Sequence, residues 1–110
     1  MKIEVLGFSD CPNYAPALKR TRAALQNLGI QAVIEEYEIN SDVAAAQAHF
    51  LGSPTVRVNG LDVEAAARYA QHFGIGCRTY IVNGERCGLP PQQWIEDTVR
   101  EAMSNGVTSA

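Results

Sequence analysis

The chain has 110 residues, a length that fits one domain with a modest hydrophobic core. Its hydrophobic content of 46% and charged content of 19% are typical of globular proteins and exclude a disordered or fibrous class. The net charge of −3 and the pI near 5.3 argue against nucleic-acid binding, which normally requires a basic surface.

No segment has the features of a membrane protein or of a secreted protein. No apolar run approaches the ~20 residues that a membrane span needs, and residues 1–5 are typical of a strand, not of a signal peptide. The three cysteines, Cys11, Cys77 and Cys87, are an odd number, which favours reduced thiols over a disulfide framework. His49 and His72 are isolated, and we interpret both as solvated helix positions. We therefore expect a cytoplasmic protein without membrane or nucleic-acid partners.

The first half of the chain predicts two strands and two helices. Residues 3–8 are apolar and predict a strand, and residues 32–39 predict a second. Between them, apolar side chains at steps of three and four predict one helix face: Tyr14, Leu18, Thr21, Leu25 and Leu28. Pro12 suits the start of this helix, and Gly29 suits its end. Such a helix is the crossover that two parallel strands require.

A second helix is predicted after residue 41, because the Ser41 hydroxyl can cap it. Its apolar stripe would consist of Val43, Ala46, Gln47 and Phe50, and Gly52 would end it. Residues 55–58 then predict a third strand. Asn59 and Gly60 are a strong hairpin signal, because both turn positions need positive φ, and residues 61–63 would pair back.

The second half predicts a short helix, a second hairpin and a last helix. Residues 65–73 predict the short helix, with Tyr69 and Phe73 on one side, and residues 77–82 predict a strand. With Asn83 and Gly84 as a two-residue turn, the register would place Tyr80 opposite Cys87. The last helix would begin at two prolines and bury four side chains, Trp94, Ile95, Val99 and Ala102. The predicted domain spans residues 1–104, and residues 105–110 are expected to be a flexible tail.

Two short motifs carry a resemblance to a known superfamily. Cys11 and Pro12 follow the first strand, and Ser53, Pro54 and Thr55 lie at the start of the third. This arrangement resembles the thioredoxin superfamily. The resemblance implies a thioredoxin-like α/β fold, with a central mixed sheet flanked by helices and a small inserted helix before the last hairpin. It also implies that Pro54 is cis and lies beside the thiol of Cys11.

The chemistry expected of the site centres on one thiol. A cysteine just ahead of a helix lies at the positive end of the helix dipole, which favours the nucleophilic thiolate. Asp10 opposes this effect, and a buried, inert Cys11 is the alternative reading. By the resemblance, Pro12, Tyr14, Ser53, Pro54 and Thr55 would contact the substrate. Tyr14 replaces the usual second cysteine; its hydroxyl could donate to the thiolate, or its ring could begin the apolar helix face.

Cys77 could restore a pair of thiols. It begins a predicted strand late in the chain. In a thioredoxin-like fold the ends of the strands lie near the N-terminus of the first helix, so Cys77 could lie close to Cys11. It could then resolve a mixed disulfide or share a metal, or it could simply pack in the core. Cys11 and Cys77 also resemble the core of organomercurial lyases, which use two cysteines and an aspartate. Tyr14 stands in the place of that aspartate. Two soft thiolates would still bind Hg(II) or Cu(I) without cleavage.

Three hypotheses follow. The first is a thioredoxin- or glutaredoxin-like thiol protein, in which Cys11 exchanges with a small-molecule or protein disulfide, with glutathione as a candidate co-substrate and no bound cofactor. A single thiol forms a mixed disulfide but cannot complete a dithiol cycle. The second is a mercury-binding or lyase-like protein using Cys11 and Cys77. The third is a non-catalytic interaction module on the same fold. The sequence leaves the oligomeric state open, a dimer included.

Overall fold

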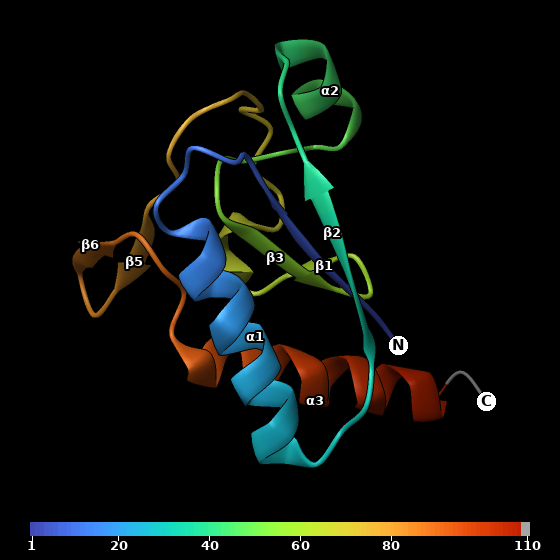
Figure 1. The fold of residues 1–110 in the computed structure, drawn as a ribbon. Helices are drawn as coiled ribbons and strands as arrows, with labels where there is room; N and C mark the ends of the chain where they lie inside the picture. The colour runs from blue at the N-terminus through green and yellow to red at the C-terminus, as the bar shows by residue number, and fades with distance from the viewer. Residues whose placement is uncertain (109–110) are drawn as a thin grey trace.

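A four-stranded mixed sheet forms the centre of the molecule (Figure 1). The structure is a computed structural model that describes the backbone of residues 1–108 and the side chains of residues 1–104. The sheet has the order β2-β1-β3-β4, and its strands are β1 (Lys2–Gly7), β2 (Val33–Glu38), β3 (Thr55–Val58) and β4 (Leu61–Asp62). β1 is parallel to β2 and antiparallel to β3, and β3 is antiparallel to β4.

Three α-helices accompany this sheet: α1 (Tyr14–Leu28), α2 (Asp42–Gln47) and α3 (Gln92–Thr108). A second, two-stranded sheet consists of β5 (Tyr80–Val82) and β6 (Glu85–Cys87) and lies apart from the main sheet in Figure 1. The predicted mixed α/β class is therefore confirmed. Within residues 1–108, every helix is too short or too polar to cross a bilayer.

The main hydrophobic core lies between the sheet, α1 and α3. Side chains at alternate positions of β1 and β3 face this core: Ile3, Val5, Val56 and Val58. They pack against α1 at Ala17, Ala24 and Leu25 and against α3 at Ile95, Val99 and Ala102. The predicted inward face of α3 is confirmed at these three positions. Gly29 ends α1 in the left-handed region at φ 66°, as its position predicted.

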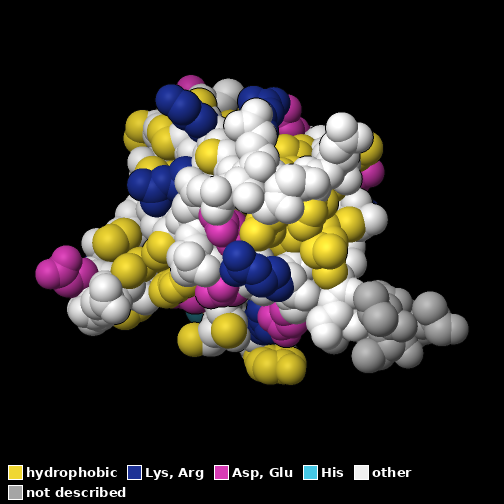
Figure 2. Space-filling model, turned by 90° about the horizontal axis from the view of Figure 1, so that it is seen from below, with side chains coloured by type: hydrophobic (Ala, Val, Ile, Leu, Met, Phe, Trp, Pro, Cys, Tyr) yellow, Lys and Arg dark blue, Asp and Glu magenta, His cyan; other side chains and the backbone are white. Residues whose placement is uncertain are grey.

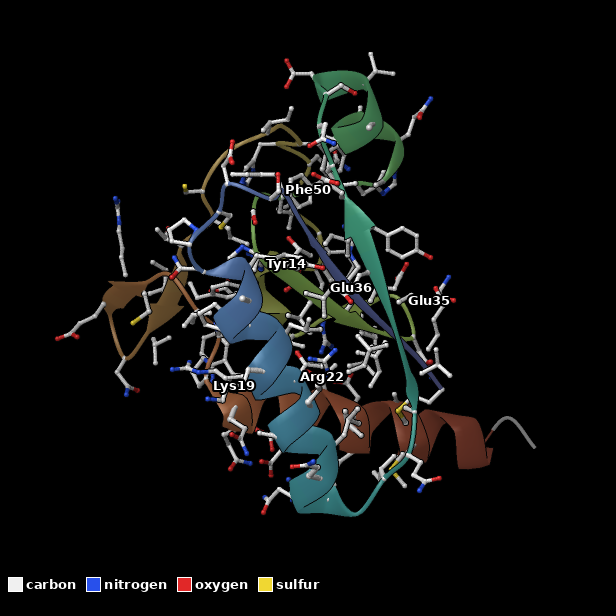
Figure 3. All side chains as sticks on the ribbon, viewed as in Figure 1. Tyr14, Lys19, Arg22, Glu35, Glu36 and Phe50 are labelled. Carbon is white, nitrogen blue, oxygen red and sulfur yellow. The ribbon has the colours of Figure 1, made fainter. Side chains whose placement is uncertain are left out.

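A smaller core cluster lies beneath α2. It consists of Leu6, Ile39, Ala45 and Phe50, of which Phe50 follows the helix and is fully buried (Figure 3). The predicted Ser41 cap is confirmed, since its hydroxyl oxygen accepts from the Ala44 N–H at 3.1 Å. The predicted apolar stripe is wrong at Val43, which is 68% exposed, and at Ala46 and Gln47, which are exposed as well. The helix is only six residues long and buries one side chain, Ala45.

Both predicted hairpin turns are confirmed. Asn59 and Gly60 have φ of 50° and 82°, and Asn83 and Gly84 have φ of 53° and 82°. The second hairpin has the predicted register, with Tyr80 opposite Cys87. It is the first hairpin, β3–β4, that joins the main sheet.

The predicted helix over residues 65–73 is wrong. Only residues Ala65–Ala67 form a single 3₁₀ turn, and Tyr69 is 91% exposed. Glu64 precedes this turn but does not cap it, because its carboxylate accepts from Arg78 and from the Ile81 N–H. A short helix without a cap or a packed face is marginal in water, so the segment stays irregular. The small inserted helix expected before the last hairpin is thus reduced to this turn.

The boundary between the predicted domain and its tail falls inside a helix. α3 continues to Thr108, whereas the sequence placed the start of the tail at residue 105. Residues 109–110 of the predicted tail lie outside the described residues.

Phe50 and Val43 give a direct test of this packing. Replacing Phe50 with Ala should lower the free energy of unfolding by about 3–5 kcal/mol, because a fully buried aromatic ring leaves a cavity. Replacing Val43 with Ala should change it by less than about 0.5 kcal/mol, because this side chain is exposed. Urea unfolding followed by circular dichroism measures both, and equal losses for the two variants would contradict the assigned packing.

Candidate thiol site

The thiol of Cys11 lies against the peptide bond that precedes Pro54. The Ser53-Pro54 bond is cis, as the sequence predicted. The Cys11 Sγ donates to the Ser53 carbonyl oxygen over 3.6 Å, a contact that requires the protonated thiol. Cys11 is only 6% exposed. The end of β1 and the start of α1 thus place this thiol beside the segment that leads into β3.

The main chain of Ser53 is fully occupied by another part of the chain, residues 76–78, which we call the 76–78 segment. The Ser53 N–H donates to the Gly76 carbonyl at 2.8 Å, and the Arg78 N–H donates to the Ser53 carbonyl at 2.9 Å. These bonds form an isolated parallel bridge between Ser53 and Cys77. Cys77 is exposed, and it precedes β5 instead of beginning a strand as predicted. Ser53 therefore contacts both Cys11 and the segment that carries Cys77.

The 76–78 segment changes the expected role of the proline region. Pro54 is less than 2% exposed, and Thr55 is fully buried with its hydroxyl donating to the Gly52 carbonyl at 2.6 Å. Ser53 is also fully buried, whereas Pro12 is exposed. In this arrangement an incoming molecule cannot touch Ser53, Pro54 or Thr55. The expectation that these three residues contact a substrate directly is not met by the geometry.

Tyr14 does not serve the thiol. Its hydroxyl donates to Glu36 Oε1 at 2.8 Å, across the gap between α1 and β2 (Figure 3). Burial, and then the hydrogen bond to Glu36, raise the pKa of Tyr14 above its ordinary value. Its ring packs against the main core and lies close to Gly7. Of the two roles left open for Tyr14, the structure thus shows packing on the apolar helix face, with the hydroxyl bonded to Glu36 and not to Cys11.

Among the described residues, no backbone N–H at the start of α1 donates to the Cys11 sulfur. The helix begins three residues after Cys11, and the Tyr14 N–H donates to the Cys11 carbonyl oxygen at 3.2 Å. The polar contact of the thiol is the Ser53 carbonyl instead. The sequence missed this because a turn separates Cys11 from the first helical residue.

A buried ion pair anchors the 76–78 segment to β4. The Arg78 guanidinium makes two bonds to the Asp62 carboxylate, at 2.7 and 2.8 Å, and a third contact to Glu64 at 3.3 Å. The Arg78 and Asp62 side chains are 4% and 6% exposed. Burial alone would lower the pKa of Arg78, but the hydrogen bonds and charges of its partners raise it. Breaking such a pair leaves an uncompensated buried charge, so the anchor is rigid.

Tyr80 connects this anchor to the proline. The Arg78 guanidinium carbon lies 4.2 Å from the centre of the Tyr80 ring, which is a cation–π contact. The Tyr80 hydroxyl donates to the Pro54 carbonyl oxygen at 2.5 Å. Burial is the main cause that raises the pKa of Tyr80, so the phenol keeps its donor proton. Asp62, Arg78 and Tyr80 are thus positioning residues that the sequence did not single out for this role.

The Ser53 hydroxyl differs from the buried polar groups around it, which have hydrogen-bond partners. Among the described residues, its hydroxyl is the buried side-chain polar group without a hydrogen-bond partner. A Cβ atom on Gly7 would lie 2.6 Å from the Ser53 Oγ, so only glycine leaves room for this hydroxyl at the end of β1. The site therefore contains one buried hydroxyl that makes no hydrogen bond among the described residues.

The remaining candidate residues lie outside this arrangement. Cys87 is half-buried on β6, opposite Tyr80. His49 follows α2 and stacks on Phe73 with ring centres 4.8 Å apart, and His72 is exposed in a loop, so neither has the predicted helical position. Within the described part of the chain, no three His, Cys, Asp or Glu side chains lie close enough together to hold a metal ion.

Comparison of the chain with protein families, with curated proteins and with solved structures finds no match.

Two tyrosines give a matched test of the positioning contacts. Tyr80→Phe should lower the free energy of unfolding by about 1–3 kcal/mol, because the buried Pro54 carbonyl loses its donor. Tyr69→Phe should change it by less than about 0.5 kcal/mol, because Tyr69 is almost fully exposed. Urea unfolding of both variants measures the difference, and an unaffected Tyr80→Phe protein would mean that the hydroxyl contributes nothing to the site.

Proposed function

We propose that this chain is a thioredoxin-like thiol protein in which Cys11 is the nucleophile of a thiol–disulfide exchange. The observation that carries the proposal is the Cys11 thiol against the carbonyl of Ser53, directly before the cis Ser53-Pro54 bond. The sheet order β2-β1-β3-β4, with a crossover helix between β1 and β2 and an antiparallel hairpin after the cis bond, supports a thioredoxin-like fold.

The exchange itself needs little from the surrounding protein. A thiolate attacks one sulfur of a disulfide, a mixed disulfide forms, and the other sulfur leaves as a thiolate. Because the Ser53 carbonyl holds the thiol hydrogen, Cys11 has to give up this bond when it ionises. The unpartnered Ser53 hydroxyl is a donor that could then hydrogen-bond to a sulfur anion. The function does not require a bound cofactor.

Turnover of a small disulfide by a thiol reductant tests this proposal. We expect the full chain to accelerate the reduction of a glutathione mixed disulfide by excess glutathione, with glutathione as co-substrate. Cys11→Ser should lower the rate well below that of the full chain. Cys87→Ser is the matched control and should keep the wild-type rate, because Cys87 lies on the separate hairpin. Full turnover by Cys11→Ser would refute the proposed role of Cys11.

A second candidate function is the binding of a soft metal ion as cargo. The observation that favours it is that Cys11 and Cys77 both meet Ser53, one through its sulfur and one through a backbone bridge. Two thiolates suffice for Hg(II), which prefers soft sulfur ligands. Tyr14 occupies the place of the lyase acid and is bonded to Glu36, so we propose binding without cleavage of a carbon–mercury bond.

Titration with Hg(II) tests this second candidate. We expect one equivalent to bind with the ultraviolet absorption of a thiolate complex. Cys11→Ser and Cys77→Ser should each abolish stoichiometric binding, because each removes half of the ligand pair, whereas Cys87→Ser should leave it unchanged. Equal binding by all three variants would contradict a site formed by Cys11 and Cys77.

A further inference from the structure

We infer that Cys77 is the thiol that meets the external disulfide, and that Cys11 then attacks the Cys77 mixed disulfide to form an internal Cys11–Cys77 disulfide. This inference rests on the proposed function and assigns the target of the Cys11 nucleophile. It also assigns the substrate class, a small neutral disulfide that carries an apolar group.

The exposure of the two thiols determines their order. Cys11 is 6% exposed, Ser53 and Pro54 are buried, and the 76–78 segment is bonded along the backbone of Ser53. Cys77 lies on that segment and is exposed. An external disulfide must bring one sulfur into line with the attacking thiolate, which requires access. Cys77 meets this condition, whereas Cys11 can be reached from within the protein.

The pairing of the 76–78 segment brings the backbone of Cys77 beside Ser53, whose carbonyl oxygen accepts from the Cys11 thiol. Ser53 and Cys77 are bridge partners, and partners in a ladder project their side chains to the same face. The Ser53 Oγ points toward Gly7, at the end of the strand that leads into Cys11. The Cys77 side chain therefore projects from the same face of this pairing as Ser53. That face is turned toward the end of β1, the strand that precedes Cys11 in the chain. Arg78, the next residue, projects to the opposite face, where it meets Asp62.

The same pairing excludes an extended peptide as the substrate at Ser53. A peptide that adds to this edge would need the Ser53 N–H and carbonyl, and both are bonded to Gly76 and Arg78. The buried Arg78–Asp62 pair opposes release of the segment. The chain thus provides its own strand, with a cysteine at the bridge position, in place of an external one.

The two steps balance as a dithiol oxidation. The Cys77 thiolate attacks the disulfide R–S–S–R, the Cys77–S–S–R bond forms, and one R–S⁻ leaves and takes a proton from water. The Cys11 thiolate then attacks the Cys77 sulfur, the Cys11–Cys77 bond forms, and the second R–S⁻ leaves. Two protein thiols are oxidised, and one external disulfide is reduced to two thiols. An external thiol reductant returns the protein to its starting state.

A groove of about 860 Å³ beside Cys77 indicates the substrate class. This volume fits a small molecule. Its lining is mainly apolar and includes Val63, Ala66, Ile81 and Trp94, together with Cys77. A disulfide with an aromatic or aliphatic group would bury that group here while its sulfur reaches the thiol of Cys77.

The charges of the groove argue against an acidic disulfide. Its two arginines are already paired, Arg68 with Glu101 at 2.9 Å and Arg78 with Asp62 and Glu64. Asp97, also in the lining, pairs with Arg100 at 3.3 Å. Figure 2 views the molecule from below Figure 1 and shows basic and acidic side chains interspersed on the face that it presents. A carboxylate on the ligand would find no unpaired guanidinium in the described lining.

A stopped-flow experiment with 4,4′-dithiodipyridine, a neutral aromatic disulfide, tests the order of the thiols. The full chain with Cys87→Ser is mixed with the probe, and release of thiopyridone is followed by absorbance. We expect a fast phase whose rate rises with probe concentration, followed by a second phase of equal amplitude that is independent of probe. Mass spectrometry should then find an internal disulfide without an adduct.

Single variants in the same background assign the phases. Cys11→Ser should keep the fast phase, lose the second phase and accumulate one adduct on Cys77. Cys77→Ser should lose the fast phase. Cys77→Ala should lose it too, which guards against a folding defect that is specific to one of the two substitutions. A fast phase that survives both Cys77 variants, or one that disappears with Cys11→Ser, would overturn the inference. A stable Cys77 adduct in the presence of Cys11 would overturn it as well.

The substrate class is tested by comparing probes and groove variants. The rate of the fast phase, divided by the rate for urea-unfolded protein, should be higher for 4,4′-dithiodipyridine than for glutathione disulfide. Ile81→Ser should lower this ratio for the aromatic probe only, because Ile81 lines the groove, whereas Val43→Ser, an exposed position elsewhere, should not. A higher ratio for glutathione disulfide would overturn the assigned class.

Failure of the inference and failure of the proposed function give different results in the glutathione turnover assay. If Cys11→Ser abolishes turnover while both Cys77 variants keep it, Cys11 reacts directly and only the inference falls. If Cys11→Ser keeps the full rate of turnover, the proposed function falls, and the inference that rests on it falls too.

Discussion

The buried guanidinium of Arg78 is stable only while it is paired with carboxylates, and this requirement determines where the chain around Cys77 lies. Arg78 is 4% exposed at its side chain and holds Asp62 through two short bonds. Removing Arg78 would leave the Asp62 carboxylate buried without this partner, at a cost of about 3–5 kcal/mol, whereas Arg78 without Asp62 would keep only its longer contact to Glu64. Because Asp62 belongs to β4 of the main sheet, the pair fixes the 76–78 segment against the strand that begins after Pro54.

This anchoring has a chemical consequence for the thiols. Ser53 receives the Cys11 thiol on its carbonyl and the 76–78 segment along its backbone, so one residue is the meeting point of both cysteines. An open thiol site would expose Ser53 and Pro54 to any extended chain. Here both residues are buried, and Cys77 is the exposed thiol beside them. This arrangement is the basis of our proposal that the site reacts with small molecules through an internal relay between the two thiols.

The sequence predicted those features that depend on local rules. The end of α1 at Gly29 and the register of the second hairpin follow from backbone conformations that glycine and asparagine adopt easily. The cis Ser53-Pro54 bond followed from a resemblance, and no composition rule would have given it. The irregular segment after Ala67 and the environment of Tyr14 depend on distant partners, Arg78 and Glu36, and therefore could not be predicted. The position of Cys77 opposite Ser53 depends on the same long-range ion pair.

Amide hydrogen exchange at Ser53 and Arg78 tests the central claim most directly, since the claim is that the 76–78 segment is bonded to Ser53. The N–H of Ser53 donates to Gly76, and the N–H of Arg78 donates to Ser53. The structure predicts that both amides exchange as slowly as those of β3, measured by NMR on the reduced full chain. Exchange of either amide at the rate of an unstructured peptide would contradict the claim and leave the Cys11 site open to external strands.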